Sequence, residues 1–140
     1  MTQESLSVDV LVVGTGASGM ATAITAASQG LKVLVVEKEA RFGGTTARSG
    51  GWLWIPGTRL AKEQGIQEPA GAARTYLQHE ATTHFDPARV DAFLEYGPKA
   101  IDFFTQKTCV QFDMPAVFAD YHAEVAGGQP GGRSMVNRPF

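Results

Sequence analysis

Residues 8–37 read VDVLVVGTGASGMATAITAASQGLKVLVVE, and this segment constrains the fold more than any other part of the chain. The branched apolar run Val10–Val13 has the character of a buried strand, and it leads into the glycine-rich turn GTGASG. A helix rich in small residues follows and stops at Gly30, a favoured helix terminator. A second apolar run then ends at Glu37. This order predicts an α/β fold that starts with a Rossmann-like βαβ unit and its parallel sheet.

Each glycine of the turn has a distinct expected role. Gly14 allows a tight turn, Gly16 lets a pyrophosphate approach the backbone, and Gly19 lets the helix pack closely on the strand. The N–H groups of the helix that begins near Ala17 favour a phosphate anion, helped by the helix dipole. Glu37 can accept hydrogen bonds from ribose hydroxyls and disfavours a 2′-phosphate. The alternative, incidental glycines and a surface Glu37, is disfavoured by the order of these features.

A second glycine-rich turn, RFGGTTARSGGWLWIPG, starts at Arg41, directly after the predicted ribose-binding acid. A nicotinamide-binding Rossmann domain normally continues into another helix and strand here. The paired glycines and hydroxyls suit a ligand that is longer than ADP and extends past its pyrophosphate. The alternative is a mobile surface loop. The large apolar residues 52–55 argue against that alternative, because we expect them to be covered.

The motifs GTGASG, VVEK, GGTTARSGG and WIP resemble the FAD-binding region of the FAD-dependent oxidoreductase 2 superfamily, which includes fumarate reductase and succinate dehydrogenase flavoproteins. Within it, the chain most resembles the 3-ketosteroid dehydrogenases, and FADYHAE with GGR resembles their DY…E…GR stretch. Members that bind flavin covalently carry a histidine where this chain has Gly44, so the resemblance implies noncovalent FAD. The residues implied to bind FAD are Gly14, Gly16, Ala17, Ser18, Gly19, Glu37, Lys38, Gly43, Gly44, Thr45, Thr46, Ser49, Gly50 and Gly51.

The same resemblance implies a substrate side. Tyr121 of the DY pair matches a tyrosine that reaches the active site, and Phe118 matches a ligand-contacting phenylalanine. Ser49 is also implied to approach the substrate. Tyr121 is the implied catalytic residue of this chain, hydrogen-bonded to a second tyrosine that acts as base and lies beyond Phe140. The residues themselves leave another interpretation open, in which Tyr121 caps a buried loop through a backbone hydrogen bond.

The implied reaction removes hydrogen from carbons next to a ketone, at the Δ1 or the Δ4 position of a steroid. A base takes the proton alpha to the carbonyl, and flavin N5 receives the hydride. The implied partners are a small apolar, steroid-like ketone and an unidentified electron acceptor. One alternative is a fumarate reductase-like enzyme, for which Arg48 and Arg133 could bind carboxylates. Another is a truncated, noncatalytic FAD-binding remnant.

Composition narrows the class of protein further. The chain has 140 residues, 44% of them hydrophobic, and a formal net charge of −2, as expected for a soluble globular domain. The twelve Lys and Arg residues form no stripe, so we expect no nucleic-acid partner. The apolar runs are too short to span a membrane, and no secretory leader is recognisable. His79 and His84 lack a convincing metal partner, so we expect no metal. The single cysteine, Cys109, favours the cytoplasm.

We expect three segments: an FAD-binding unit over 1–57, a helical scaffold over 58–108, and the start of a substrate-side segment over 109–140. The scaffold is expected to hold helices over 58–65 and 68–83, one that starts at Asp86 and is interrupted at Gly97, and another that starts at Pro98. The family's enzymes are several times longer, so we interpret the chain as an incomplete N-terminal portion. Alone, it is expected to be inactive and to leave apolar surface uncovered.

Overall fold

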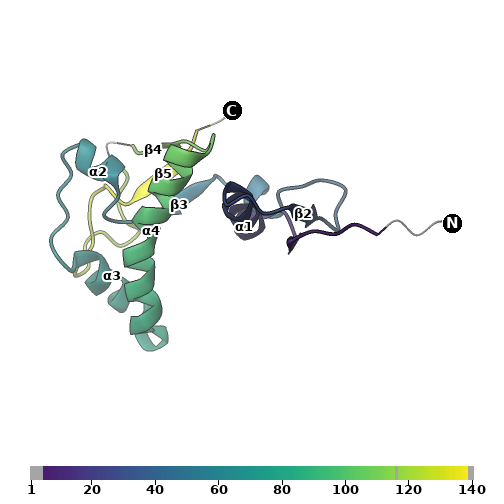
Figure 1. Cartoon of the computed structure of the whole chain (residues 1–140). Helices are drawn as coiled ribbons and strands as arrows, with labels where there is room; N and C mark the ends of the chain where they lie inside the picture. The colour runs from purple at the N-terminus through teal and green to yellow at the C-terminus, as the bar shows by residue number, and fades with distance from the viewer. Residues whose placement is uncertain (1–4, 116, 139–140) are drawn as a thin grey trace. The chain divides into compact units, whose positions relative to one another are not determined.

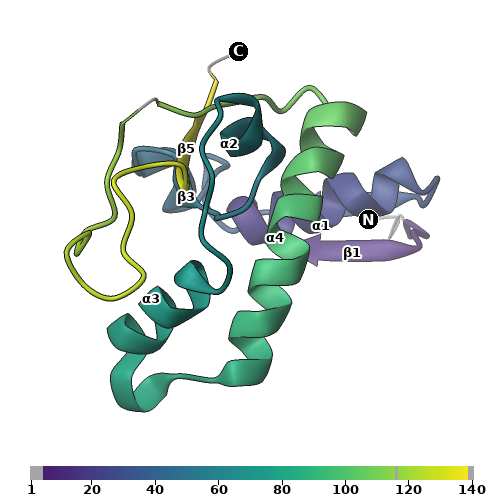
Figure 2. The same ribbon diagram turned by 90° about the vertical axis from the view of Figure 1, so that its left-hand side faces the viewer.

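Residues 5–115 and 117–138 are described by a computed structural model, in which the chain divides into two units, Met1–Gly51 and Trp52–Phe140. Each unit has its own sheet, and we describe each by itself (Figures 1 and 2). The three segments expected from the sequence divide the chain by function instead, and they stay a prediction.

The first unit contains the expected βαβ arrangement. Strand β1 (Val10–Val13), helix α1 (Ala17–Ser28) and strand β2 (Val33–Val36) follow one another, and the two strands pair in parallel. The pairing continues past the strands, because the Gly14 N–H donates to the Val36 carbonyl at 2.7 Å. Strand, glycine turn, helix and second strand therefore lie where the sequence predicted them.

Helix α1 ends in the way that its sequence predicts. Gly30 adopts a positive φ of 83°, which costs a glycine little. Its N–H donates to the Ala27 carbonyl at 3.0 Å, and the Leu31 N–H donates to the Ala26 carbonyl at 3.3 Å. These two bonds are those of a Schellman motif, which satisfies the last carbonyls of the helix.

Only one face of β1 is covered within the described residues. Val12, 6% exposed, packs on the side of helix α1, whereas Leu11 and Val13 are 57% and 79% exposed. The expectation that Val10–Val13 is a buried strand is therefore wrong for Leu11 and Val13 in the chain as it stands. Uncovered apolar surface next to a two-stranded sheet agrees with the expectation of an incomplete fold.

The second unit contains a sheet that the sequence analysis did not predict. Strands β3 (Trp52–Trp54), β5 (Ser134–Asn137) and β4 (Phe112–Asp113) are antiparallel, with β5 in the centre. They are two to four residues long, too short for a clear alternation of apolar and polar residues. As an edge strand, β3 leaves Trp52 and Leu53 exposed, so the expectation that all of 52–55 is covered is wrong for these two.

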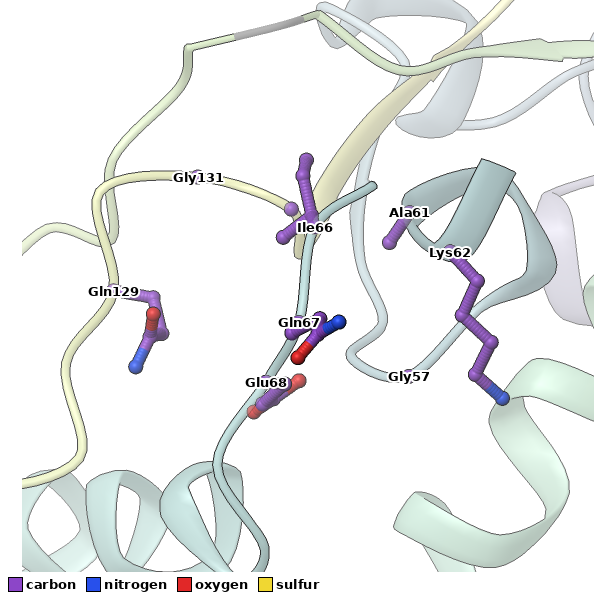
Figure 3. A pocket seen from close by; sticks show the side chains of 9 residues that line it. Gly57, Ala61, Lys62, Ile66, Gln67, Glu68, Gln129 and Gly131 are labelled. Carbon is purple, nitrogen blue, oxygen red and sulfur yellow. The ribbon is translucent and has the colours of Figure 1, made fainter. Parts of the chain in front are cut away.

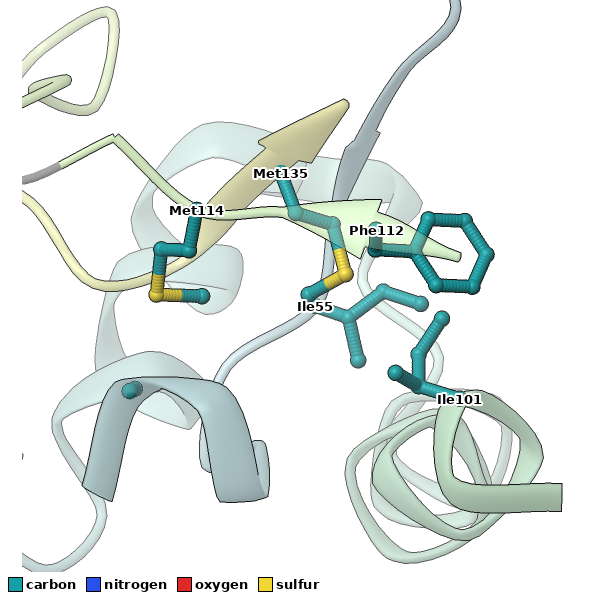
Figure 4. Close-up of a cluster of buried hydrophobic side chains, with 6 residues drawn as sticks. Ile55, Ile101, Phe112, Met114 and Met135 are labelled. Atoms are coloured by element: carbon teal, nitrogen blue, oxygen red, sulfur yellow. The ribbon is translucent and has the colours of Figure 1, made fainter. Parts of the chain in front are cut away.

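One hydrophobic cluster joins this sheet to the helices of the second unit (Figure 4). Ile55 follows β3, and its side chain lies beside Ile101 of helix α4 (Pro87–Lys107). Helix α2 (Arg59–Glu63) contributes Ala61, and its N-cap Thr58 accepts a bond from the Ala61 N–H. The buried members of the cluster are Ile55, Ala61, Ile101, Phe112, Met114 and Met135.

Helix α4 starts as predicted but does not stop where expected. The Asp86 side chain accepts from the Arg89 N–H at 3.2 Å, and Pro87 takes the first turn. The expected interruption at Gly97 and Pro98 is wrong, because the helix continues through Pro98 to Lys107. Proline removes one hydrogen bond from the helix interior. Packing offsets this loss: a Cβ on Gly97 would lie 3.0 Å from Ile55 Cγ2, so the small residue lets the helix approach the core.

Helix α3 (Ala72–Ala81) is shorter than the expected 68–83 and packs against α4. Two single-turn 3₁₀ helices, η1 (Thr46–Arg48) and η2 (Thr82–His84), complete the described helices. In the described part of the chain, we find no helix that combines the length and the apolar character needed to cross a bilayer.

Candidate functional site

The glycines of the first turn meet different surroundings. A Cβ on Gly19 would lie 2.1 Å from the Gly14 carbonyl oxygen, so this position requires glycine for the helix to pack on the turn. A Cβ on Gly16 would meet only Thr46 Oγ1, at 3.8 Å. The chain itself therefore leaves space at Gly16, and the local fold does not require a glycine there. This contrast is what a ligand approaching the backbone at Gly16 would explain.

The N-terminus of α1 presents backbone donors beside that space. Gly16 is the N-cap and makes no side-chain capping bond. The Ala17 N–H donates to Thr46 Oγ1 at 3.1 Å, so the hydroxyl comes from the second glycine turn. Ser18 is exposed at the next position of the helix. Because the first N–H groups of a helix have no partner within it, this end favours an anion.

Glu37 is held in place by Thr15, a residue that the sequence analysis did not single out. Glu37 Oε2 accepts from the Thr15 N–H at 2.9 Å and from the Thr15 hydroxyl. Glu37 Oε1 accepts from the Glu39 N–H at 3.1 Å. The Thr15 hydroxyl is the main reason that the pKa of Glu37 falls to about 2, so the carboxylate is ionised at neutral pH. A hydroxyl residue inside the GxG triplet was the available signal.

The second glycine turn packs on the first through the same threonine. Thr15 Oγ1 accepts from the Gly43 N–H at 2.7 Å while it donates to Glu37. Gly43 has a φ of 108°, and a Cβ there would lie 2.5 Å from Ala47 Cβ. A Cβ on Gly44 would lie 3.5 Å from the Gly16 Cα. The two turns therefore form one surface around Gly16.

The remaining predicted cofactor residues lie at the edge of this surface. Ser49 Oγ donates to the Thr46 carbonyl at 2.8 Å and accepts from the Gly51 N–H at 3.1 Å, which closes the end of η1. Lys38, Thr45 and Gly50 are exposed. The bonds through Thr15 and Thr46 bring Ala17, Glu37 and Gly43 of the predicted cofactor residues together.

In the second unit, aromatic side chains line a hollow of about 370 Å³. Trp52 of β3 stacks on Phe118, with ring centroids 4.1 Å apart. Trp54 stacks on Tyr76 of α3 at 5.7 Å. Phe118 and Tyr121 both line this hollow, and the Tyr121 side chain is 94% exposed. Because Tyr121 is so exposed, it does not cap a buried loop through its hydroxyl.

Next to Tyr121, a buried ion network is formed by Asp120, Arg133 and Glu68. Arg133 Nη1 donates to Asp120 Oδ2 at 2.6 Å, and Arg133 Nη2 donates to Glu68 Oε1 at 2.6 Å. The side chains of Arg133 and Asp120 are each 1% exposed. The expectation that Arg133 is available to bind a substrate carboxylate is therefore wrong, since its charge is already paired inside the protein.

Two further features bear on ligand chemistry. A second hollow, of about 360 Å³, lies between α2, residues 66–68 and the loop 129–132, and it shares Glu68 with the ion network (Figure 3). Its other polar lining residues are Lys62, Gln67 and Gln129. Over residues 5–115 and 117–138, no three His, Cys, Asp or Glu side chains are grouped so that they could hold a metal ion.

The βαβ unit, the two joined glycine turns and the anchored Glu37 define a dinucleotide-binding protein. The sequence model of one family, described as FAD binding domain, matches residues 9–138. This chain therefore belongs to the FAD binding domain family. The predicted cofactor, FAD, is confirmed at the level of the family.

Curated relatives share this assignment. The chain is 44% identical over 132 residues to a 3-oxosteroid 1-dehydrogenase of Mycobacterium tuberculosis (strain ATCC 25618 / H37Rv), covering 94% of this chain and 23% of the relative. It is also 44% identical over 133 residues to a 4-oxocyclohex-2-ene-1-carboxylate 5-dehydrogenase of Sinomonas cyclohexanicum, covering 95% and 22%. The chain thus spans less than a quarter of the length of these relatives.

A solved structure is similar over nearly the whole chain. It is the 3-ketosteroid delta1-dehydrogenase of Sterolibacterium denitrificans in complex with 1,4-androstadiene-3,17-dione, with a TM-score of 0.86 and 36% identity over 95% of this chain and 23% of that one. The resemblance to 3-ketosteroid dehydrogenases predicted from the sequence is confirmed, and so is the Rossmann-like start of the fold.

Proposed function

We propose that this chain is the FAD-binding, N-terminal portion of a dehydrogenase that oxidises a cyclic ketone, with a 3-ketosteroid as the first candidate substrate. The observation that carries the proposal is the contrast between Gly16 and Gly19. Gly19 is required by packing within the chain, whereas the space at Gly16 is required by nothing in the chain. The similarity to 3-oxosteroid dehydrogenases supports the choice of substrate class.

The adenosine and pyrophosphate of FAD would bind at the first glycine turn. The N-terminus of α1, with Ala17 and Ser18, would meet the pyrophosphate beside Gly16. Glu37 would accept the ribose hydroxyls. Its two oxygens accept three bonds from Thr15 and Glu39, and a carboxylate offers about four acceptor positions, so capacity remains.

The rest of the cofactor would lie along the second glycine turn. Gly43, Gly44 and Gly51 would allow close approach, while Thr45, Thr46 and Gly50 would offer donors, with Lys38 nearby. Ser49 already donates one bond and accepts another, which leaves it an acceptor position for a ligand. Gly44 stands where covalent members carry histidine, so the proposed binding is noncovalent.

The substrate would lie against the aromatic hollow of the second unit. Phe118 and Trp52 offer stacked apolar rings to a flat, apolar ligand. Tyr121 presents its hydroxyl to solvent and can donate a hydrogen bond to a reacting group. We assign Tyr121 the catalytic role in this chain, with the base supplied by a residue outside 1–140. When bound, FAD supplies the acceptor for the hydride that leaves the substrate.

A smaller substrate is the second candidate. The Sinomonas relative is named for a 4-oxocyclohexene carboxylate, which is a cyclic ketone with an acidic group. Such a substrate needs a free cation for its carboxylate, and Arg133 is already paired with Asp120 and Glu68. The same pairing removes Arg133 from the two cations of the fumarate reductase-like alternative, whereas Arg48 is exposed at the end of η1. The noncatalytic remnant stays an alternative that an activity assay decides.

The proposed location is the cytoplasm, and its support is cysteine usage alone. Cys109 is the single cysteine of the sequence and is a free, exposed thiol. Structural disulfides are typical of oxidising compartments. Fractionation of source cells, followed by detection of the protein with an antibody, would test this location.

The test uses the full-length gene product that contains this sequence. We expect the purified protein to retain yellow FAD and to oxidise 4-androstene-3,17-dione with an artificial electron acceptor. Gly16→Ala should lose FAD while the fold is retained, because its φ of −66° suits alanine and the chain leaves room for the Cβ. Tyr121→Phe should keep FAD and turn over more slowly.

The matched control is Cys109→Ala, an exposed position outside the first unit, which should keep both flavin and activity. Retention of FAD by Gly16→Ala would contradict the proposed cofactor site. Activity on 4-oxocyclohexene carboxylate but not on the steroid would replace the first candidate substrate by the second. Flavin binding without activity on either ketone would favour the remnant.

A further inference from the structure

The ion network beside Tyr121 contains further hydrogen bonds besides its two ion pairs. Arg133 Nε also donates to Glu68 Oε1 at 3.0 Å, and Arg133 Nη2 donates to the Gly127 carbonyl at 2.9 Å. Asp120 Oδ1 accepts from Trp54 Nε1 at 2.7 Å, and Asp120 Oδ2 accepts from the Gln129 N–H at 2.9 Å. Besides their bond to each other, the buried guanidinium and the buried carboxylate therefore bind four residues from three segments: Trp54, Glu68, and Gly127 with Gln129.

Stability alone is a weak reason for such a network. Burying three charges costs solvation free energy, and replacing a buried ion network by apolar side chains is often neutral or stabilising. The guanidinium carbon of Arg133 lies 5.4 Å from the ring centroid of Trp54 and 5.5 Å from that of Tyr76. An apolar side chain in place of Arg133 would therefore pack against aromatic rings. Hydrogen bonds between charged groups depend on direction. The network therefore fixes the position of the backbone that carries these side chains.

That backbone carries Tyr121. Asp120, its neighbour on one side, is locked into the network. On its other side, the His122 N–H lies 3.5 Å from the Tyr76 hydroxyl, and His122 Nδ1 lies 2.8 Å from Glu80 Oε2 of α3. The Tyr121 side chain is 94% exposed, so packing of its own ring contributes little to holding it. The two neighbours thus hold the backbone from which the Tyr121 side chain extends.

We propose that Asp120 and Arg133 are positioning residues for Tyr121: their buried ion pair fixes the backbone from which the tyrosine reaches the reacting carbons. The inference rests on the proposed function, in which Tyr121 acts in catalysis. The strength of the clamp lies in the two oxygens of Asp120, which face different donors. An asparagine has one such oxygen, so its NH₂ group would face either Trp54 Nε1 or Arg133 Nη1, donor against donor.

Asp120→Asn in the FAD-loaded full-length protein is the first test. We expect kcat, normalised to bound FAD, to fall about tenfold or more with KM little changed, because a displacement of about 1 Å can cost about 100-fold in rate. Asp113→Asn is the matched control, since Asp113 pairs with Arg138 at the surface of the same unit. It should leave kcat unchanged. Trp54→Phe is a second variant that keeps one aromatic ring but removes the Nε1 donor to Asp120 along with the rest of the indole.

A double-mutant cycle with Tyr121→Phe separates positioning from general loosening of the fold. If Asp120 acts through Tyr121, Asp120→Asn should lower kcat in the wild-type background and have no further effect in Tyr121→Phe. A loss of folded protein would multiply kcat by the same factor in both backgrounds. Trp54→Phe should also lower kcat only when Tyr121 is present, by a smaller factor. If Asp120→Asn does not fold, the Trp54→Phe cycle tests the positioning role in its place.

The outcomes distinguish the inference from the function on which it rests. If Tyr121→Phe leaves kcat unchanged, the catalytic role of Tyr121 fails, and the positioning role fails with it. If Tyr121→Phe lowers kcat but Asp120→Asn and Trp54→Phe act independently of it, or leave kcat unchanged, only the inference is overturned. The inference is supported if Asp120→Asn lowers kcat when Tyr121 is present and has no further effect in Tyr121→Phe.

Discussion

The two units of the chain build their candidate sites from different parts of the polypeptide. The first unit, residues 1–51, offers backbone donors and glycine positions, and the hydroxyls of Thr15 and Thr46 join its two glycine turns. The second unit, residues 52–140, relies on side chains that are distant in sequence, such as Arg133 and Glu68, 65 residues apart. The comparison teaches that the first unit offers space and backbone donors, whereas the loop around Asp120 is held by buried, charged side chains.

Removal of the charge at the centre of the second unit should have the largest effect on stability. Arg133→Leu leaves two buried or half-buried carboxylates, Asp120 and Glu68, without their cation, and loss of one partner of such a network costs about 3–5 kcal/mol. Urea unfolding followed by tryptophan fluorescence measures it. Arg138→Leu, at an exposed ion pair, is the control and should change the midpoint little. Equal changes in the two unfolding midpoints would mean that the buried network stabilises the fold no more than the exposed ion pair does.

In the first unit, glycine packing should matter next. Gly19→Ala places a Cβ 2.1 Å from the Gly14 carbonyl, and overpacking of this kind costs about 1–3 kcal/mol. Gly16→Ala, whose Cβ would have room, should leave the unfolding midpoint without FAD unchanged. The pair is compared by urea unfolding in the absence of added flavin. If Gly16→Ala were the more destabilising change, the space at Gly16 would have a structural explanation.

Thr15→Val should act on the electrostatics of the first unit more than on its fold. Loss of the hydroxyl removes the main cause of the low pKa of Glu37, so that pKa should rise from about 2 toward its ordinary value of 4.5. Carbon-13 NMR titration of the carboxylate measures this shift. Thr22→Val removes a hydroxyl that bonds only to the Ser18 carbonyl and should leave the pKa unchanged.

The smallest expected effect is a pH dependence in the second unit. The bond to Glu80 raises the pKa of His122 above 6.5, so its stabilisation is fully present below 6.5 and is lost as pH rises through the raised pKa. The His122 bond, helped by His79, lowers the pKa of Glu80 below 4.5, so that stabilisation is present above 4.5 and is lost as pH falls through the lowered pKa.

His122→Gln should therefore differ from the wild type in unfolding midpoint mainly between 4.5 and 6.5, and the difference should shrink above the raised pKa of His122. Urea midpoints across this pH range test it. The matched control is His84→Gln, at an exposed histidine at the end of η2. A difference that persists unchanged in alkaline solution would show that the contact is not ionic.

Much of the first unit could be predicted because its determinants are local. The turn glycines, the Gly30 cap and the alternation of strand and helix each depend on residues within a few positions of one another. The short strands β3, β4 and β5 could not be predicted, because two to four residues carry too little periodicity and their pairing is nonlocal. The continuous helix α4 was missed for a related reason: contact of Gly97 with Ile55 outweighs the local effect of Pro98.

The sequence by itself determined the class of fold, the FAD cofactor and the family, because these depend on backbone conformations and donor positions that a few residue types at fixed spacing specify. Only the tertiary structure decided the fate of Arg133, which the residue type alone would allow to bind a substrate, and the role of Thr15 between the two glycine turns. The physical reason is that pairing of a buried charge or hydroxyl depends on which distant segments meet around it.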